Sequence, residues 1–449
     1  MVNNLLNALI DPGTFQSWDD AVRESVITGT GSVGGFPAAI VASDFAVQGG
    51  SIGLVAGQRL TRAVERATAR RLPLIALPAS GGTRMQEGTA AFLQMLRVTA
   101  AVTAHKAAGL PYLAYLRHPT TGGVLASWAS LAHVTVAEPG ALIGFLGPRV
   151  YEALEGEPFP AGIQTAEHLH ACGLVDAVVR PADLAGYFGR VLAVLAPGPA
   201  SRDAREMGGV GTAGRTTDAW ESVVRTRQAG RLRGADLLRA VADDVVRLRE
   251  DGGLLLALGR VSGTAVVCVA QEGDGPFGIR GVDLFLRGLR MAEELRAPLL
   301  TVIDTPGAEL SVAAEEAGVA GKLAQCIAAM ISLPVPTVAV LLGQGTGAAA
   351  LALLPADRVL AAGPAWLAPL APEGASAIVY RDTAHAAELA RAQGITAADL
   401  VAAGMVDQVA AEGESLPTAV RTALADVAGR DPGERLADRA QRLRALGVE

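Results

Sequence analysis

Short apolar runs alternate along the chain with longer segments in which apolar residues recur every three or four positions. In the first half the runs cover residues 72–77 and 110–116, and in the second half residues 297–303 and 335–342. Each run is followed by a turn of Gly and small residues and then by good helix formers. Runs without polar alternation are typical of strands buried on both faces of a parallel sheet. The pattern therefore predicts an α/β fold with helices wrapped around a mostly parallel sheet.

The two halves repeat one another at a constant offset. Pro73 and Pro298, near the start of the first apolar run of each half, lie 225 positions apart, and so do Pro111 and Pro336 before the second runs. The stretches "GLVDAVV" and "GMVDQVA" echo each other near the end of each half. Because an offset held over so many residues is unexpected by chance, we infer two copies of one α/β unit.

Composition marks the boundary between the copies. Residues 196–219 are rich in Gly, Ala, Pro and small polar residues, which is typical of a linker. The sequence predicts a first domain at 1–196, a linker at 197–217 and a second domain at 218–449. The tail, residues 431–449, is expected to form a charged amphipathic helix exposed to solvent.

Charge and hydropathy limit the kinds of partner. The 449-residue chain has a net charge of −7 and no concentrated basic cluster, so we expect no nucleic-acid partner. Residues 323–356 carry no charge, but Pro and Gly divide them into helix, strand, turn and helix, so we expect no membrane span. The three cysteines are far apart and no leader is evident, which favours a cytoplasmic location.

The turns that follow the second runs offer free backbone amides. Gly122 and Gly123 in "TTGG" correspond at the same offset to Gly347 and Ala348 in "GTGA". Amides at a helix start lack partners, and ligands of parallel sheets gather at the carboxyl ends of strands. Two such donors make an oxyanion hole, in which one donor contributes about 3–4 kcal/mol of transition-state stabilisation. The alternative is that the glycines only permit close packing; small residues at the same places in both copies favour two oxyanion holes.

Side-chain catalysis has weaker support. Glu87 and Glu138 could act as an acid–base pair for hydrating an enoyl thioester, although a helix-start carboxylate and a surface charge are simpler interpretations. No nucleophile elbow, phosphate-binding loop or metal-ligand spacing occurs, so we expect no metal and no ATP chemistry.

The same stretches resemble the carboxyltransferase component of acetyl-CoA carboxylase. The first half resembles the β-subunit through "ASGGTRMQEG", "GLPYLAYLRHPTTGGVLASWA" and "AEPGALIGFLGPRVYE". The second half resembles the α-subunit through "RAPLLTVIDTPGAE", "LPVPTVAVLLGQGTGAAALAL" and "LAPEGASAIVYRD". The likeness covers nearly the whole chain in the same motif order, and it indicates a fused β–α polypeptide.

The resemblance implies two crotonase-like domains, each a ββα superhelix, in tandem. It implies transfer of a carboxyl group from carboxybiotin, on a separate biotin carboxyl carrier protein, to the α-carbon of acetyl-CoA or a similar thioester, with malonyl-CoA as product in fatty acid or polyketide synthesis. A separate biotin carboxylase and at least a homodimer would follow. The sequence leaves open whether coenzyme A or an acyl carrier protein bears the acyl group.

The resemblance also assigns roles to residues. The amides of Gly122 and Gly123 would hold the thioester enolate oxygen, and those near Gly347 and Ala348 the ureido oxygen of biotin. The remaining expected binding residues line these two sites: Ser80, Gly81, Gly82, Phe145, Leu146, Gly147, Gly345 and Thr346.

Several positions depart from the family pattern. The zinc ribbon of the β-subunit is absent, His118 replaces the usual Asp before "PTTGG", and the usual GEGGSGGA reads "GQGTGAAA" at 343–350. The α-subunit's basic stretch is reduced to "QEGDGPFGIRG" at 271–281. These changes lie mostly on the biotin side, so two alternatives stay open: a biotin-independent decarboxylase of a malonyl-type thioester, and a non-catalytic subunit of a carboxylase complex.

Overall fold

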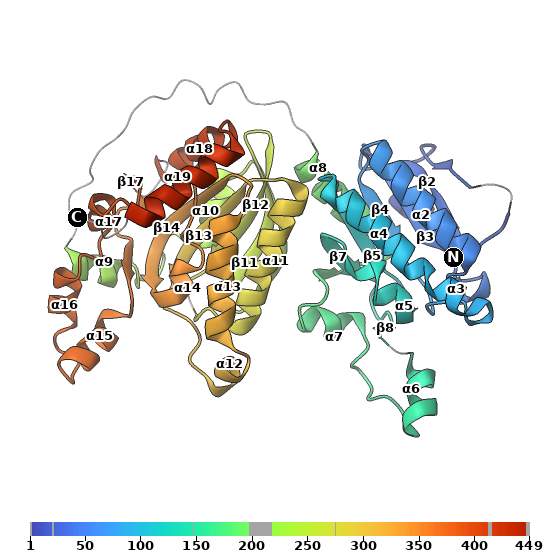
Figure 1. Cartoon of the computed structure of the whole chain (residues 1–449), viewed down its shortest axis with the longest axis horizontal. Coiled ribbons are helices and arrows are strands. Elements are labelled where there is room, and N and C mark those ends of the chain that lie inside the picture. Colours follow the sequence, from blue (N-terminus) through green and yellow to red (C-terminus); the bar gives the residue numbers. More distant parts are fainter. Residues whose placement is uncertain are drawn as a thin grey trace. The chain divides into compact units, whose positions relative to one another are not determined.

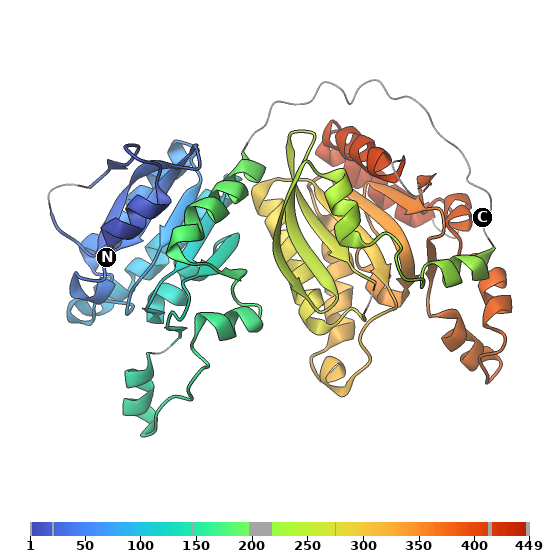
Figure 2. The ribbon, with the colours of Figure 1, turned by 180° about the vertical axis from the view of Figure 1, so that it is seen from behind.

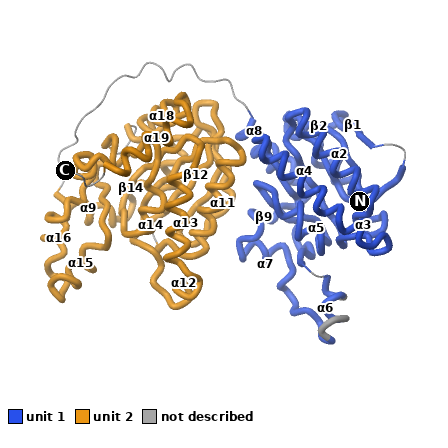
Figure 3. Tube along the Cα trace, in the orientation of Figure 1, with its two compact units in different colours: residues 1–196 blue, residues 197–449 orange. Residues whose placement is uncertain are grey.

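The computed structural model describes residues 2–19, 22–145, 147–196, 218–273, 275–411 and 415–445. The chain divides into two compact units, residues 1–196 and 197–449 (Figure 3). The predicted linker at 197–217 lies outside the described residues.

Unit 1 is built on a seven-stranded sheet of order β1-β2-β3-β4-β5-β7-β9, antiparallel from β1 to β3 and parallel from β3 onward. A small parallel pair, β6 and β8, lies beside it. The strands are β1 Gln16–Ser17, β2 Val26–Val33, β3 Phe36–Ser43, β4 Leu74–Leu77, β5 Tyr112–Leu116, β6 Thr120–Thr121, β7 Val134–Ala137, β8 Ile143–Gly144 and β9 Ala177–Val178.

Helices cover both faces of this sheet. Helices α2 and α4 pack together on one face, and α1 and α8 contact each other at the other (Figures 1 and 2). Helix α6 projects away from the unit (Figure 1). The helices are α1 Val2–Leu9, α2 Leu54–Ala69, α3 Gly88–Phe92, α4 Gln94–Ala107, α5 Gly122–Leu125, α6 Pro148–Glu155, α7 Ala166–Ala171 and α8 Leu184–Leu195.

Unit 2 repeats this plan with an eight-stranded sheet of order β10-β11-β12-β13-β14-β15-β17, in which β16 pairs with β14. Its first three strands are antiparallel and the others parallel. The strands are β10 Asp244–Asp251, β11 Leu254–Val261, β12 Thr264–Gln271, β13 Leu299–Thr305, β14 Thr337–Thr346, β15 Arg358–Ala362, β16 Trp366–Ala368 and β17 Gln408–Ala410.

Helices α11 and α13 pack together against this sheet, and α10 and α18 form a second contacting pair (Figure 1). The helices are α9 Ala219–Arg225, α10 Gly234–Val241, α11 Ile279–Leu295, α12 Val312–Glu316, α13 Val319–Ser332, α14 Gly347–Leu351, α15 Pro372–Val379, α16 Ala386–Ala392, α17 Ala397–Ala402, α18 Ser415–Ala428 and α19 Pro432–Ala445.

Backbone hydrogen bonds confirm the repeat. The Ile52 N–H donates to Gly82 O at 2.9 Å. The Phe277 N–H donates to Gly307 O at 2.8 Å, and this donor and acceptor each lie 225 positions after those of the first bond. The bond from Leu74 to Pro111 is likewise matched in the second copy, at the same offset. The two copies therefore share their hydrogen-bond plan as well as their sequence pattern.

The uncharged segment 323–356 is resolved as the sequence predicts. It forms the rest of α13, a short loop, strand β14 and then α14, which begins at the residue after the strand. Within the described ranges, no helix is both long and apolar enough to cross a membrane.

Helix α19 differs from the expectation of a solvent-exposed tail. Its Arg435 and Arg439 are only 2% and 1% exposed, and both pair with the equally buried Asp357. The Arg439 guanidinium also donates to three carbonyls at the end of α13, of which Leu333 O is one. The last carbonyls of a helix have no partner inside it, so Arg439 docks α19 by capping α13.

We expect Asp357→Asn to lower the free energy of unfolding of unit 2 by about 3–5 kcal/mol, because two buried guanidiniums lose their counter-charge. Denaturant unfolding with a probe in unit 2 measures this. Gln441→Ala, at an exposed position of α19, is the matched control and should change stability by less than about 0.5 kcal/mol. Equal stabilities of the two variants would contradict the docking role of the ion pairs.

A buried histidine makes unit 1 sensitive to acid. His105 is fully buried, with Nδ1 3.0 Å from Thr68 Oγ1 and Nε2 3.2 Å from Pro111 O. Burial lowers the pKa of His105 from 6.5 to about 4. The unfolded chain thus binds a proton between these pH values that the folded chain does not, so stability falls as the pH drops through this window.

We expect His105→Gln to flatten the loss of stability between pH 6.5 and 4 by up to about 3 kcal/mol. Unfolding free energies measured across that range provide the test. His385→Gln, at a half-buried position in unit 2, serves as control and should keep the wild-type slope. An unchanged slope in His105→Gln would show that this imidazole is not the group responsible.

Candidate functional site

In unit 1 the structure brings the two predicted glycine turns into backbone contact. The turn after β4 carries Gly81 and Gly82, and the turn after β6 carries Gly122 and Gly123. A Cβ added to Gly82 would lie 3.3 Å from Gly123 N, and one added to Gly122 would lie 3.2 Å from Gly81 O. Residues with side chains would therefore push the two turns apart.

The two adjacent amides of the second turn differ in availability. The Gly122 N–H donates to Phe145 O at 2.9 Å, and Gly122 has a φ of +63°. The Gly123 N–H, at the start of α5, has no partner among the residues that the structure describes. The donor available to a ligand here is thus Gly123, whereas Gly122 supplies the left-handed conformation that the turn requires.

The other expected residues of unit 1 have distinct positions. Ser80 is fully buried, and its Oγ accepts the Gly82 N–H at 3.0 Å, so its hydroxyl braces the turn. Phe145 is 68% exposed and Gly147 precedes α6 as its N-cap. Leu146 lies outside the described residues.

Unit 2 has the equivalent site. The Gly307 N–H donates to Thr305 Oγ1 at 3.1 Å, as Gly82 does to Ser80, and Gly347 has the same φ of +63° as Gly122. The Ala348 N–H has no partner within the described ranges. The amide at this second position is therefore free in both copies.

Thr346 adds a second unpaired group beside this amide. Its side chain is only 3% exposed, and Oγ1 has no hydrogen-bond partner in the described part of the chain. An orphaned buried hydroxyl is costly unless a ligand or water completes it. The site around Ala348 can thus offer a ligand one amide and one hydroxyl.

The glycines of "GQGTGAAA" serve mainly as packing residues. A Cβ on Gly343 would lie 2.4 Å from Asp304 Oδ1, and one on Gly345 would lie 2.7 Å from Trp366 O. Ala349 and Ala350 are fully buried, whereas Ala348 is exposed. Of the three alanine side chains in this motif, only that of Ala348 therefore faces the candidate site.

Buried polar groups fix the turn of unit 2, and sequence reasoning missed them. Gln271 is fully buried and bridges the Asp304 N–H and Ala349 O. Asp304 Oδ2 lies 2.5 Å from Arg231 Nη1, and burial raises the pKa of Asp304 although this arginine opposes the shift. Arg231 and Asp304 are 73 positions apart, so no local sequence pattern indicates that they form an ion pair.

A second missed arginine joins the same turn to α15. Arg227 Nε donates to Gln344 Oε1 at 3.2 Å, and its Nη1 pairs with Glu373 Oε1 at 2.6 Å. The pKa of Glu373 is lowered, mainly by the hydrogen bond from Arg227 and further by the charge of this arginine. Arg227 thus holds strand β14 to the first turn of α15.

The proposed Glu87–Glu138 acid–base pair finds no support in the geometry. Glu87 Oε2 accepts the Leu54 N–H at the start of α2, and its other oxygen pairs with Arg84. Glu138 Oε2 accepts the His118 N–H at 3.0 Å. Each carboxylate is engaged in holding a different loop.

His118, which departs from the family pattern, also has a structural partner. Its Nδ1 accepts the Leu142 N–H at 3.1 Å, a bond that a carboxylate could accept equally well. The replacement of Asp therefore keeps an acceptor at this place in the loop.

Two family models match the chain, one for each unit. The carboxyl transferase domain model matches residues 13–180, and the acetyl co-enzyme A carboxylase carboxyltransferase-like model matches residues 215–447. Together with the paired amide sites, these matches define the class: the chain belongs to the acyl-CoA carboxyltransferase family.

Individual relatives agree over most of their length. The probable biotin-dependent acyl-coenzyme A carboxylase beta3 subunit of Mycobacterium tuberculosis is 49% identical, over 99% of this chain and 98% of the relative. The acetyl-coenzyme A carboxylase carboxyl transferase subunits beta/alpha of Salinispora arenicola are 39% identical, over 87% of this chain and 73% of the relative.

A solved structure shows the same fold. Transcarboxylase 12S, a hexamer with methylmalonyl-coenzyme A and methylmalonic acid bound, superposes with a TM-score of 0.79 at 24% identity, over 96% of this chain and 90% of that one. The predicted pair of crotonase-like units is thereby confirmed.

Proposed function

We propose that the protein transfers a carboxyl group from carboxybiotin, held on a separate carrier protein, to the α-carbon of an acyl-CoA thioester. The observation that carries the proposal is the free amide of Gly123, set against the Gly81–Gly82 turn and matched in unit 2 by the amide of Ala348. A reaction between a thioester and a ureido group develops negative charge on one oxygen of each reactant. Two backbone donor sites suit this chemistry.

On the thioester side, a backbone N–H of the protein would stabilise the enolate. The Gly123 N–H would donate to the thioester oxygen as the α-proton leaves, because this donor is strongest towards a developing enolate. The two glycine turns leave no Cβ to hinder the approach of the thioester. Four of the polar side chains near these turns are already engaged in hydrogen bonds or an ion pair: Ser80, Glu87, His118 and Glu138.

On the biotin side, the residues present fit a ureido group. The Ala348 N–H and the Thr346 hydroxyl have no partner among the described residues and are uncharged, as suits a carbonyl oxygen that gains charge only during reaction. When bound, carboxybiotin supplies CO2 by cleavage of its N–C bond, and its freed nitrogen accepts the α-proton. This chemistry explains why the protein needs no base of its own.

The biotin-independent decarboxylase remains the second candidate, because an enolate site alone would serve it. Its main motivation was the row of methyl groups in "GQGTGAAA". Since Ala349 and Ala350 are buried in the unit, only the methyl group of Ala348 among the three alanines is exposed to a ligand. The geometry favours the biotin-dependent reaction.

Finer assignments extend this proposal. Acetyl-CoA as acceptor and malonyl-CoA as product follow the Salinispora relative, whereas the mycobacterial relative is named only for acyl-coenzyme A. A biotin carboxyl carrier protein and a biotin carboxylase would be separate partners. We further propose a cytoplasmic homodimer or larger homo-oligomer, and substrates borne on coenzyme A instead of an acyl carrier protein.

The proposal predicts release of CO2 from malonyl-CoA that depends on added biotin. Incubating the protein with malonyl-CoA, with and without free biotin, and following CO2 and acetyl-CoA measures this directly. Equal release without biotin would instead establish the decarboxylase. Binding of neither malonyl-CoA nor acetyl-CoA would favour a non-catalytic subunit.

We expect Gly123→Pro to lower kcat for this reaction by about 10²–10³-fold, because it removes the free N–H while proline is tolerated in the first turn of a helix. Gly123→Ala keeps the N–H and is the matched control, with a smaller loss. Proline at Gly122 would be a poorer test, since it would remove the bond to Phe145 and cannot adopt a φ of +63°. Equal kcat values in the two Gly123 variants would refute the role of this amide.

A further inference from the structure

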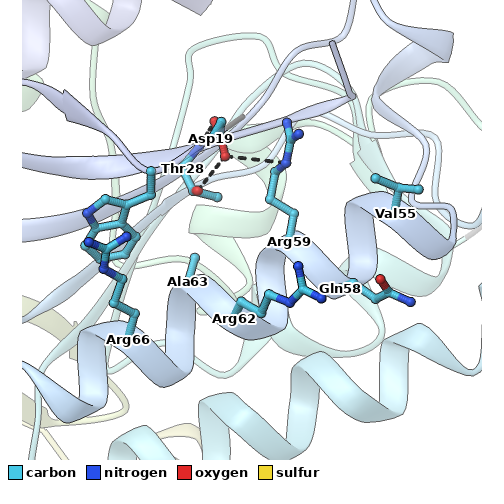
Figure 4. A pocket seen from close by; sticks show the side chains of 9 residues that line it. Asp19, Thr28, Val55, Gln58, Arg59, Arg62, Ala63 and Arg66 are labelled. Carbon is cyan, nitrogen blue, oxygen red and sulfur yellow. Dashed lines mark hydrogen bonds and ion pairs between the residues drawn. The ribbon is translucent and has the colours of Figure 1, made fainter. Parts of the chain in front are cut away.

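A groove of about 210 Å³ lies on the outer side of α2 in unit 1, between this helix and strand β2 (Figure 4). We call it the arginine groove and define it by the residues Trp18, Asp19, Thr28, Arg59, Arg62 and Arg66. Ala63 forms a small floor among the three arginines. None of these residues belongs to the amide sites described above.

One arginine of the groove is already neutralised. Asp19 accepts hydrogen bonds from both the N–H and the hydroxyl of Thr28, at 2.8 and 2.7 Å. The Arg59 Nε lies 3.4 Å from the same carboxylate, and its guanidinium also donates to Val26 O. Figure 4 shows Asp19 joined to both Thr28 and Arg59. The Asp19 carboxylate is thus engaged with Thr28 and Arg59.

The other cations lack a counter-charge. Arg62, Arg66 and Arg70 follow one another at intervals of four along one face of α2 and its end, and all three are exposed. No carboxylate pairs with any of them in the described part of the chain. Like charges at this spacing cost a helix about 0.2–0.5 kcal/mol per pair. The row is a local excess of positive charge in a chain of net charge −7.

Trp18 holds two of these arginines in place. The Arg66 guanidinium carbon lies 4.6 Å from the centre of the Trp18 ring, and that of Arg70 lies 5.7 Å away. Stacking on tryptophan restrains a flexible side chain without consuming its N–H donors. Arg66 is therefore oriented in advance while its hydrogen-bonding edge stays available.

We propose that the arginine groove is a binding site for a phosphate-bearing anion, with Arg62 and Arg66 as its main ligands. Guanidinium groups bind phosphate oxygens through two parallel N–H bonds, and the volume of the groove suits one or two phosphate groups. Gln58, which lines the groove beside Arg62, adds an amide donor (Figure 4).

Such an anion can come from two sources. One is a free diphosphate-bearing metabolite that binds apart from the substrate; the other is the 3′-phosphate of a CoA thioester. The second source rests on the proposed function, whereas the first does not. The two sources share the same chemistry at Arg62 and Arg66.

Calorimetric titration of the full chain with inorganic pyrophosphate tests the site itself. We expect Arg62→Gln and Arg66→Gln each to weaken pyrophosphate binding by about tenfold or more, and added salt to weaken it further in the wild type. Arg180→Gln removes an equal charge from an exposed position outside the groove and should leave the affinity unchanged. Equal affinities in the groove variants and the control would overturn the proposal.

Titrations with CoA and with 3′-dephospho-CoA identify the source. If the groove holds the 3′-phosphate, Arg62→Gln weakens CoA binding but not 3′-dephospho-CoA binding. If it holds a free metabolite, both CoA compounds bind the variant as they bind the wild type while pyrophosphate binding is lost. If neither pyrophosphate nor CoA binding responds to Arg62 and Arg66, the site does not exist. Because these are binding measurements, failure of carboxyl transfer would leave their outcome intact.

Discussion

The contact between two glycine turns is the constraint on which the rest of the site depends. In unit 1 the backbone of Gly81–Gly82 lies directly against that of Gly122–Gly123, so that a Cβ on Gly82 or Gly122 would crowd the facing backbone at 3.3 or 3.2 Å. This approach requires a left-handed residue at Gly122, whose N–H is then used by Phe145. The next amide, that of Gly123, has no partner among the described residues and lies just beyond the carboxyl end of the sheet's strands. A free donor held rigidly in this way can stabilise an oxyanion without the reorganisation that water requires.

Duplication has kept the left-handed glycine and the free amide after it, while other contacts of the turn have changed. Thr305 braces the second copy as Ser80 braces the first, with a hydroxyl in both cases. In another pair the chemistry differs: His133 Nδ1 accepts the N–H of Tyr112, whereas Asp357 Oδ2 accepts the N–H of Thr337 at the equivalent strand position. What persists is the hydrogen bond to the backbone, which shows that the fold constrains the acceptor more than the residue type.

The sequence was sufficient to predict the units, the repeat and the two glycine turns, because each depends on local patterns of apolar and small residues. It could not separate Gly122 from Gly123, since that distinction depends on the hydrogen bond that the Gly122 N–H donates to Phe145 O, more than twenty residues away. It also failed for α19, where the charge pattern resembles an exposed helix but Arg435 and Arg439 are buried against Asp357. Long-range pairs of opposite charge leave no periodic signal, and the same holds for Arg231 with Asp304.

The most direct measurement is a crystal structure of the protein with a non-hydrolysable acyl-CoA analogue. The account predicts that the oxygen replacing the thioester carbonyl lies within about 3.1 Å of Gly123 N. An oxygen directed away from this amide, in a site otherwise occupied by the ligand, would contradict it.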